Sequence, residues 1–262
     1  MLPTGLLLLY HILIYHGIII GILKGAKMKF KVESDIFKKI PDLYIGVVVA
    51  KSIDNSKAYP EVDKLLEKSI KLAERRFLDK KVKEDASIVP YREAFSKLGM
   101  NPNKFQCSAE ALFTRISKGK GLPNINPLVD LNNAVSLKHT LPMGTHDLSL
   151  SHNDIELRYT RKGDVFIPMG SDKKEELDLG EVAYIVGNEV RTRRWAWRQG
   201  EHGKITAETN YVFFPIDGFH NINDGEVDKA ANELAELLKR IFGCKVKIGY
   251  VDCNQQSFEW SF

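Results

Sequence analysis

The chain has 262 residues, of which 44% are hydrophobic and 27% charged, so it can bury the core of one large domain or two small ones. With this composition, disorder is not the default expectation for the bulk of the chain. The net charge of +4 permits a nucleic-acid partner without requiring one, because dedicated nucleic-acid-binding domains are usually more basic.

The first 27 residues form an apolar extension. Gly5–Leu23 carries no charge and is just long enough to span a bilayer, and the lysines that follow it favour a cytoplasmic side. Met28 opens a polar stretch typical of a soluble protein. Three interpretations therefore stay open: a start assigned upstream of the true one, a membrane anchor, or an extra buried helix. We expect a single domain over 28–262 and, unless the extension is an anchor, a cytoplasmic protein.

The first elements of this domain have clear patterns. Leu43–Ala50 is a continuous apolar run rich in β-branched residues, which predicts a buried strand. Tyr59–Phe77 has an apolar stripe at helical spacing, with Pro60 in its first turn. Tyr91–Leu98 predicts a short amphipathic helix that ends at Gly99.

Two further helices follow. We expect Ser108 to cap a helix over Ala109–Lys118, because serine accepts well at the N-cap position. Asn126 is predicted to cap the next helix, which has Pro127 at its first position.

After Pro142 the pattern changes to short alternating runs punctuated by Gly and Asp, as in an antiparallel sheet. The runs are Ile155–Arg161, Val165–Pro168, Val182–Val186, Glu189–Arg198 and Ala207–Ile216. Asp224–Phe242 is predicted as a helix capped by Asp224 and ended by Gly243, and Lys245–Val251 as a last strand. The fold class is α+β, with a mixed or antiparallel sheet flanked by helices.

The stretch RTRRWAWR, Arg191–Arg198, has an unusual composition. Arginine binds phosphate in a bidentate manner and indole offers a stacking plane for a base, a combination suited to an RNA end. On a strand, alternation places four of these side chains on one face: Arg191, Arg193, Trp195 and Trp197. The alternative is that the tryptophans belong to the core and the arginines solvate an edge.

Other residues give weak signals. The histidines of the second half show no metal-ligand spacing, and a single histidine has many non-catalytic uses; they are His139, His146, His152, His202 and His220. The three cysteines form no CxxC pair, which supports neither a disulfide framework nor a zinc site; they are Cys107, Cys244 and Cys253. No GxSxG, P-loop or GxGxxG occurs. We predict no metal and no cofactor.

Several strings occur in a characteristic order: PYREAFSKLGMNP, SAEALFTRI, GKGLPNINPLVDLNNAVSL, LPMGTHDL, GEVAYIV and RRWAWR. Together they resemble the free-standing B3/B4 domain proteins, relatives of the editing module of the phenylalanyl-tRNA synthetase beta subunit. The resemblance is most recognisable over 90–217. It implies a B3/B4-like α+β fold and a tRNA-related protein.

The synthetase module hydrolyses mischarged tyrosyl-tRNA, and the resemblance carries its pocket over in part. Asn133 inherits the place of a pocket residue. Gly144 stands where the synthetase has a pocket histidine, with His146 two positions later. Glu201 lies in the matching Gly-Glu-His segment. Pro215 stands in place of the glutamate thought to read the tyrosine hydroxyl, so we do not expect tyrosine specificity.

The resemblance thus implies a trans-editing aminoacyl-tRNA deacylase. In this interpretation Asn133 and amides near Gly144 stabilise the oxyanion, and His146 or Glu201 orients the water. The residues expected to bind the substrate or the tRNA are Arg193, Arg194, Trp195, Trp197 and Thr209. The partner is the aminoacylated 3′ end of a tRNA, with no role for DNA. A tRNA-binding module without catalysis and a protein that binds a free amino acid or metabolite remain as alternatives.

Overall fold

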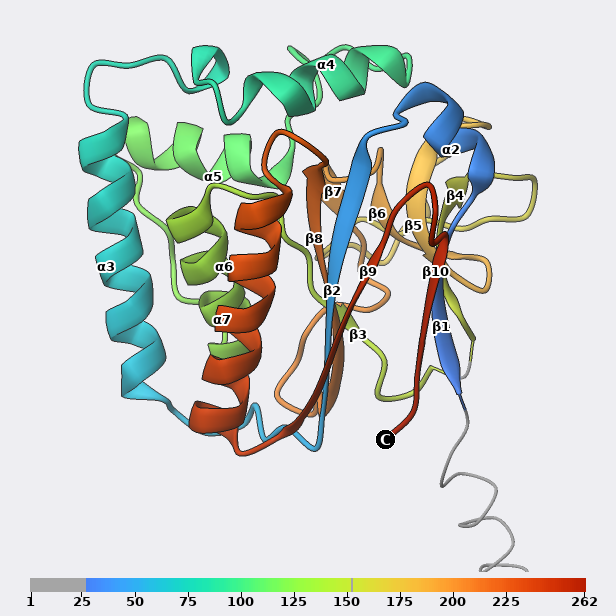
Figure 1. Cartoon of the computed structure of the whole chain (residues 1–262). Coiled ribbons are helices and arrows are strands. Elements are labelled where there is room, and N and C mark those ends of the chain that lie inside the picture. The colour runs from blue at the N-terminus through green and yellow to red at the C-terminus, as the bar shows by residue number, and fades with distance from the viewer. Residues whose placement is uncertain (1–26, 152) are drawn as a thin grey trace, which may run out of the picture.

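The computed structural model describes residues 27–151 and 153–262. Figure 1 shows three layers: helices α3, α5, α6 and α7, a sheet containing β2, β8 and β9, and a second sheet containing β1, β4, β5 and β6. The helices are α2 Ser34–Lys39, α3 Pro60–Arg76, α4 Val89–Lys97, α5 Ser108–Ser117, α6 Pro127–His139 and α7 Asp224–Phe242, with a 3-10 turn at Val82–Glu84. The strands are β1 Met28–Val32, β2 Leu43–Lys51, β3 His146–Asp147, β4 Ile155–Tyr159, β5 Val182–Val186, β6 Glu189–Arg193, β7 Arg198–Gln199, β8 Tyr211–Phe219, β9 Lys245–Val251 and β10 Ser257–Trp260.

The strands form two sheets. The six-stranded sheet has the order β10-β1-β4-β5-β6-β7, and the four-stranded sheet has the order β3-β8-β2-β9. β1 pairs with β4 in parallel, and the other strand pairs are antiparallel. The predicted α+β class with a mixed sheet and flanking helices is confirmed. Because their partners lie at the far end of the sequence, the short strands β1 and β10 were not predicted.

The central strands β2 and β8 of the four-stranded sheet are buried on both faces, and β2 shows why such a strand is apolar without alternation. Ile45, Val47 and Val49 face the six-stranded sheet, where they join one apolar cluster. Val48 and Ala50 face the helices and join a second cluster with residues of α6 and α7. A strand covered on both sides needs apolar residues at every position, so the prediction of a buried strand is confirmed.

The predicted helices are all present, but two of the predicted caps are wrong. The Asn126 side chain does accept a hydrogen bond from the third amide of its helix, at 3.1 Å, as expected. Ser108 is instead the first residue of α5, and Cys107 occupies the N-cap position. Asp224 is likewise the first residue of α7, after Asn223 at the N-cap.

The second half corrects three strand predictions. Val165–Pro168 makes only isolated bridges and no strand. The run predicted from Ala207 enters a strand only at Tyr211. The predicted strand Glu189–Arg198 ends at Arg193, because Arg194 and Trp195 adopt φ values of 48° and 60°.

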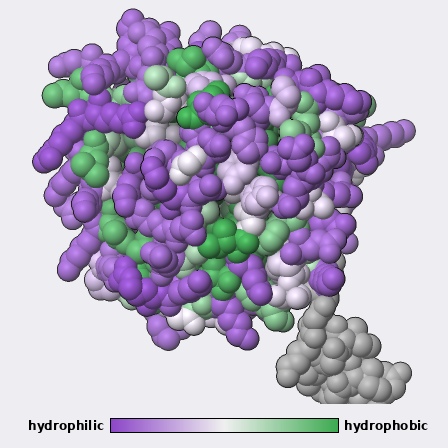
Figure 2. Space-filling model, in the orientation of Figure 1, coloured by the Kyte–Doolittle hydropathy of each residue, from purple (hydrophilic) through white to green (hydrophobic). Residues whose placement is uncertain are grey.

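The surface in Figure 2 is hydrophilic over most of the face shown, with smaller hydrophobic areas between the polar side chains. Within 27–151 and 153–262, no helix is long and apolar enough to cross a membrane. Residues 1–26 lie outside the described part, so the three interpretations of the apolar extension stay predictions. The three cysteines are free, with Cys107 and Cys244 buried and Cys253 exposed.

Candidate functional site

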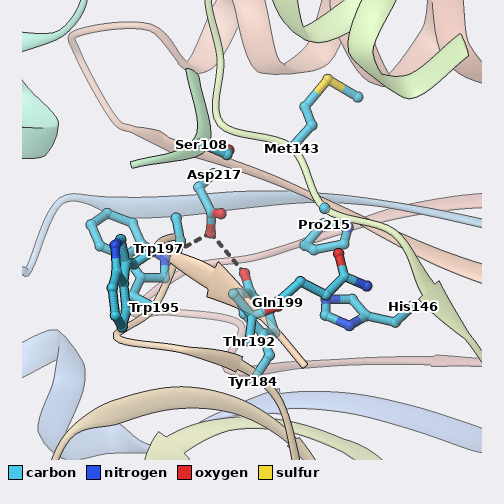
Figure 3. A pocket seen from close by; sticks show the side chains of 12 residues that line it. Ser108, Met143, His146, Tyr184, Thr192, Trp195, Trp197, Gln199, Pro215 and Asp217 are labelled. Atoms are coloured by element: carbon cyan, nitrogen blue, oxygen red, sulfur yellow. Dashed lines mark hydrogen bonds between the residues drawn. The ribbon is translucent and has the colours of Figure 1, made fainter. Parts of the chain in front are cut away.

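A cavity of about 100 Å³ lies between the two sheets. The four-stranded sheet contributes residues of β3 and β8, and the six-stranded sheet contributes residues of β5, β6 and β7. Figure 3 shows these side chains around the cavity, with Asp217 on one side and His146 on another. We refer to it as the inter-sheet cavity.

Asp217 is the carboxylic acid of this cavity and is only 2% exposed. Its Oδ1 accepts two hydrogen bonds, from Tyr184 Oη at 2.7 Å and from Trp195 Nε1 at 2.8 Å (Figure 3). Its Oδ2 has no hydrogen-bond partner in the described part of the chain. Burial raises the pKa of Asp217 to about 6, although both hydrogen bonds favour the carboxylate. The group therefore titrates close to neutral pH, as a general base should.

The backbone of Asp217 is fixed from two sides. Its amide donates to Pro142 O at 3.0 Å, and its carbonyl accepts from Tyr91 Oη of α4 at 2.8 Å. The Tyr91 hydroxyl in turn accepts from Asn223 Nδ2 at 2.8 Å. The carboxyl group is thus held on a rigid strand, and its position does not depend on a mobile loop.

His146 is a buried imidazole with no hydrogen bond. It is 1% exposed, and both of its ring nitrogens lack a partner among the described residues. The ring packs against Tyr184 and Phe213, with centroid distances of 5.4 and 5.9 Å. Burial, assisted by the nearby Arg191 cation, lowers the pKa of His146 to about 3. His146 is therefore neutral at physiological pH and keeps one N–H donor and one acceptor unused.

Gly144 lies directly against this histidine. A Cβ on Gly144 would stand 3.3 Å from His146 Nε2 and 3.2 Å from Pro215 Cγ. The Gly144 amide itself donates to Pro215 O at 3.1 Å, and the binding of an oxyanion by amides near Gly144 stays a prediction. Gly144, His146 and Pro215 are in contact with one another. A substitution at any of these three positions would therefore affect the other two.

Trp195 reaches the cavity through a strained turn. Two consecutive non-glycine residues, Arg194 and Trp195, adopt left-handed backbone conformations, each at a cost of about 1–3 kcal/mol. The Trp195 amide donates to Val182 O at 2.6 Å, and its indole donates to Asp217. These two hydrogen bonds hold Trp195 in its strained backbone conformation. The predicted alternation through this stretch is therefore wrong, because the turn carries Trp195 into the core beside the carboxyl group.

The neighbouring arginines already have carboxylate partners. Arg193 bonds both oxygens of Glu181, at 2.7 and 2.8 Å, and also contacts Glu175. Both members of the Arg193–Glu181 pair are at least 95% buried. Arg194 pairs with Asp178. These contacts neutralise the arginines within the fold, and their contact with RNA stays a prediction.

The structure brings part of the predicted site together. Gly144, His146, Trp195 and Trp197 line the inter-sheet cavity. The other predicted residues do not line it: Asn133, Glu201, Arg193, Arg194 and Thr209. Asn133 lies half-buried on α6.

Two of these other residues have structural contacts. Glu201 accepts from Gly170 N and pairs with Lys204. Thr209 donates to Asp147 at 2.6 Å. Both therefore order loops beside the cavity without reaching into it.

Sequence reasoning missed Asp217, Tyr184 and Gln199, which line the cavity. One signal was available for Asp217, because it is the only charged residue in the nine-residue strand YVFFPIDGF. A carboxylate inside a strand that is otherwise apolar needs a compensating reason. Tyr184 and Gln199 carry no comparable local signal.

The comparisons with known proteins define the class. The B3/4 domain family matches residues 90–243, which is more than half of the chain, so this protein belongs to that family. The predicted resemblance to B3/B4 domain proteins is thereby confirmed.

Among solved structures, the chain is similar to an N-terminal fragment of the phenylalanyl-tRNA synthetase beta subunit from Pyrococcus horikoshii. The identity is 17% and the TM-score 0.38, and the match covers 46% of this chain and 41% of that one. No curated protein matches the sequence. In the described ranges, no group of three or more His, Cys, Asp or Glu residues is arranged to hold a metal ion.

Proposed function

We propose that the inter-sheet cavity hydrolyses the ester bond of a mischarged aminoacyl-tRNA, which makes the protein a trans-editing deacylase. The observation that carries this proposal is Asp217. It is a buried carboxyl group with one oxygen fixed by Tyr184 and Trp195, the other oxygen unpartnered, and a pKa raised to about 6. Family membership and the synthetase-like sequence strings support tRNA as the carrier of the ester.

The chemistry follows from this arrangement. The ionised Asp217 takes a proton from a water molecule, whose oxygen forms a bond to the ester carbonyl carbon. When the tetrahedral intermediate collapses, the bond to the ribose oxygen breaks and the proton passes from Asp217 to that oxygen. The products are a free amino acid and uncharged tRNA. A neutral His146 supplies an N–H donor for the developing oxyanion.

The size of the cavity limits what it can hold. At about 100 Å³ it is below the ~300–1,000 Å³ typical of ligand pockets, so a nucleotide does not fit inside. It can accept the reacting ester with a small side chain, while the tRNA stays outside. Pro215 and Met143 give the cavity apolar walls, and these favour a small apolar amino acid over a charged one.

The test is the release of amino acid from a panel of mischarged aminoacyl-tRNAs by protein that starts at Met28. We expect turnover of one or two of them, and a loss of about 10²–10⁴-fold in Asp217→Asn, which keeps the shape and removes the base. The matched control is Asp252→Asn, another buried carboxylate that lies outside the cavity, and it should retain full activity. Equal activity in both variants would refute the role of Asp217.

One observation favours a second candidate, a tRNA-binding module without catalysis. Both nitrogens of His146 are enclosed by protein atoms, so a substrate reaches them only if the cavity opens. A binding module predicts that uncharged and charged tRNA bind equally well, with a strong salt dependence, and that no ester is cleaved. A third outcome, saturable binding of a free amino acid with indifference to tRNA, would indicate a small-ligand protein.

A further inference from the structure

A second hollow, of about 250 Å³, is lined by residues of β3 and β6 and contains Arg191. Arg191 is only 7% exposed. Among the described residues, its Nε is buried without a hydrogen-bond partner, and its one ionic contact is Glu189 Oε2, 2.7 Å from Nη2. A guanidinium carries five N–H donors, and buried donors are nearly always satisfied. This side chain has donors to spare for a ligand.

A β-bulge between β5 and β6 directs Arg191 into this hollow. Tyr184 pairs with Thr192 and Ile185 pairs with Val190, which leaves Arg191 as the extra residue of a β-bulge. Bulges change the direction of a side chain and are frequent beside functional sites. The bulge separates Arg191 from Arg193, whose guanidinium lies over the Phe166 ring on the outer side of the sheet.

Gly203 leaves room for the guanidinium. A Cβ at this position would stand 2.4 Å from Arg191 Nη1, and its φ of +74° also favours glycine. The backbone therefore approaches the guanidinium closely from one side. His202 and Lys204, on either side of Gly203, line the same hollow. The Nδ1 atom of His202 is also buried without a hydrogen bond.

The hollow and the inter-sheet cavity share three chain segments. In β3, His146 lines the cavity and Asp147 lines the hollow. In β6, Thr192 lines the cavity and Arg191 the hollow. After β7, the chain passes from Gln199 in the cavity to His202 in the hollow. A ligand at Arg191 would therefore be a near neighbour of a group bound in the cavity.

We infer that this hollow is a phosphate-binding site in which Arg191 is the main ligand and His202 assists. Lys204 lines the same hollow but is paired with Glu201. The acidic neighbours are compatible with an anion. Asp147 already accepts from Ser149 N and Thr209 Oγ1. Glu189 has a side chain that is 39% exposed, so it can turn into solvent when a phosphate takes its place on Arg191. The binding of phosphate stands by itself; its assignment to the terminal nucleotide of the aminoacyl ester rests on the proposed function.

The direct test is calorimetric titration with inorganic phosphate, adenosine 5′-monophosphate and adenosine. We expect both phosphates to bind and adenosine to bind at least tenfold more weakly. Arg191→Gln should weaken the phosphates by about ten- to a hundredfold, because it removes charge-assisted hydrogen bonds. Arg198→Gln, at an arginine with a 42% exposed side chain, is the control and should bind like the wild type.

A second variant, Glu189→Gln, should change the affinity in the opposite direction. It replaces a partly exposed side chain and not a buried one. It removes the carboxylate that competes for Arg191, so it should tighten phosphate binding. Wild-type affinity in both Arg191→Gln and Glu189→Gln would overturn the inference. If Arg191→Gln does not fold, unchanged affinity in Glu189→Gln overturns it alone.

A pair of small substrates separates this inference from the proposed function. They are a 3′-aminoacyl adenosine and the same ester with a 5′-phosphate. Faster cleavage of the phosphorylated ester, with the advantage lost in Arg191→Gln, supports both proposals. If neither ester is cleaved while phosphate still depends on Arg191, the deacylase proposal fails and the phosphate site stands. Equal cleavage of both esters, unaffected by Arg191→Gln, removes the link between the sites.

Discussion

Two neighbouring regions of this protein use their polar side chains in opposite ways. In the Arg193–Arg194 turn, guanidinium groups meet Glu175, Asp178 and Glu181, and their charges are neutralised within the fold. In the inter-sheet cavity, both ring nitrogens of His146 are buried without a hydrogen bond from the residues that the structure describes. The hydrogen bonds to the Asp217 carboxylate from those residues go to its Oδ1. The first region has an unusual amino-acid composition, and its charged groups are paired with one another in the structure. The second is inconspicuous in sequence and leaves its polar atoms available.

The difference teaches where to look for function. A cluster of charged residues indicates a binding surface only when their partners are missing from the fold. A polar atom that stays buried and unpaired lowers the stability of the fold by about 1–3 kcal/mol, so its presence calls for a compensating use. Three substitutions sharpen or break this comparison.

The largest effect is expected from Arg193→Gln. It leaves Glu181, whose side chain is 5% exposed, with only Arg194 at 3.4 Å as an ionic partner, so the free energy of unfolding should fall by about 3–5 kcal/mol. Urea denaturation measures this loss. Arg198→Gln, at a side chain that is 42% exposed, should lose less than about 1 kcal/mol. If the two variants lose equal stability, the Arg193 pair is not the structural element described above.

The next effect concerns Asp217 and pH. Its folded pKa of about 6 lies above the ordinary value of 3.8, so the folded state binds the proton more tightly than the unfolded state. The stability that it contributes is present below pH 3.8 and is lost as pH rises through 6, a change of about 3 kcal/mol. Urea titrations at several pH values should show this decline in the wild type and not in Asp217→Asn. Activity should change in the opposite direction, with kcat/KM rising through pH 6.

The smallest effect is expected from His146→Phe. It replaces two unpaired buried nitrogens with carbon, so unfolding at pH 7 should require about 1–3 kcal/mol more. The lowered pKa of His146 means that the wild type loses stability as pH falls below 6.5, and the difference should widen there. His220→Phe is the matched control: His220 bonds Asp252 at 3.1 Å, and its loss should destabilise the protein. A less stable His146→Phe would show that the imidazole has a partner within the fold.

The elements that could be predicted from the sequence are those with a clear pattern within their own residues. The strand at Leu43 and the helices at Tyr59 and Asp224 follow from apolar runs or periodicity, because each element meets the core along its whole length. The resemblance led to Gly144 and His146. The bulge at Arg191 was beyond reach, because a bulge arises from the register between two strands and has no pattern in either strand alone.

The cavity was predictable only in part for a similar reason. Asp217 is recognisable in sequence as the one charged residue of its strand. Its environment, however, is set by Tyr184 and Trp195, which come from a second sheet and a strained turn. Neither the left-handed conformation of Trp195 nor its bond to the carboxylate follows from composition. The structure was needed to bring these three residues together.

The pairing of β1 between β4 and β10 has a consequence for biogenesis. Met28 lies opposite Trp260, so one of the first segments of this domain to be synthesised finds a partner among the last. At ribosomal rates of roughly 5–20 residues per second, the hydrophobic edge of β1 waits on the order of ten seconds or longer for its neighbour. During that interval β1 has an unpaired edge, which is a target for chaperones. The six-stranded sheet therefore gains its outermost strand β10 only after every other strand of the domain has been synthesised.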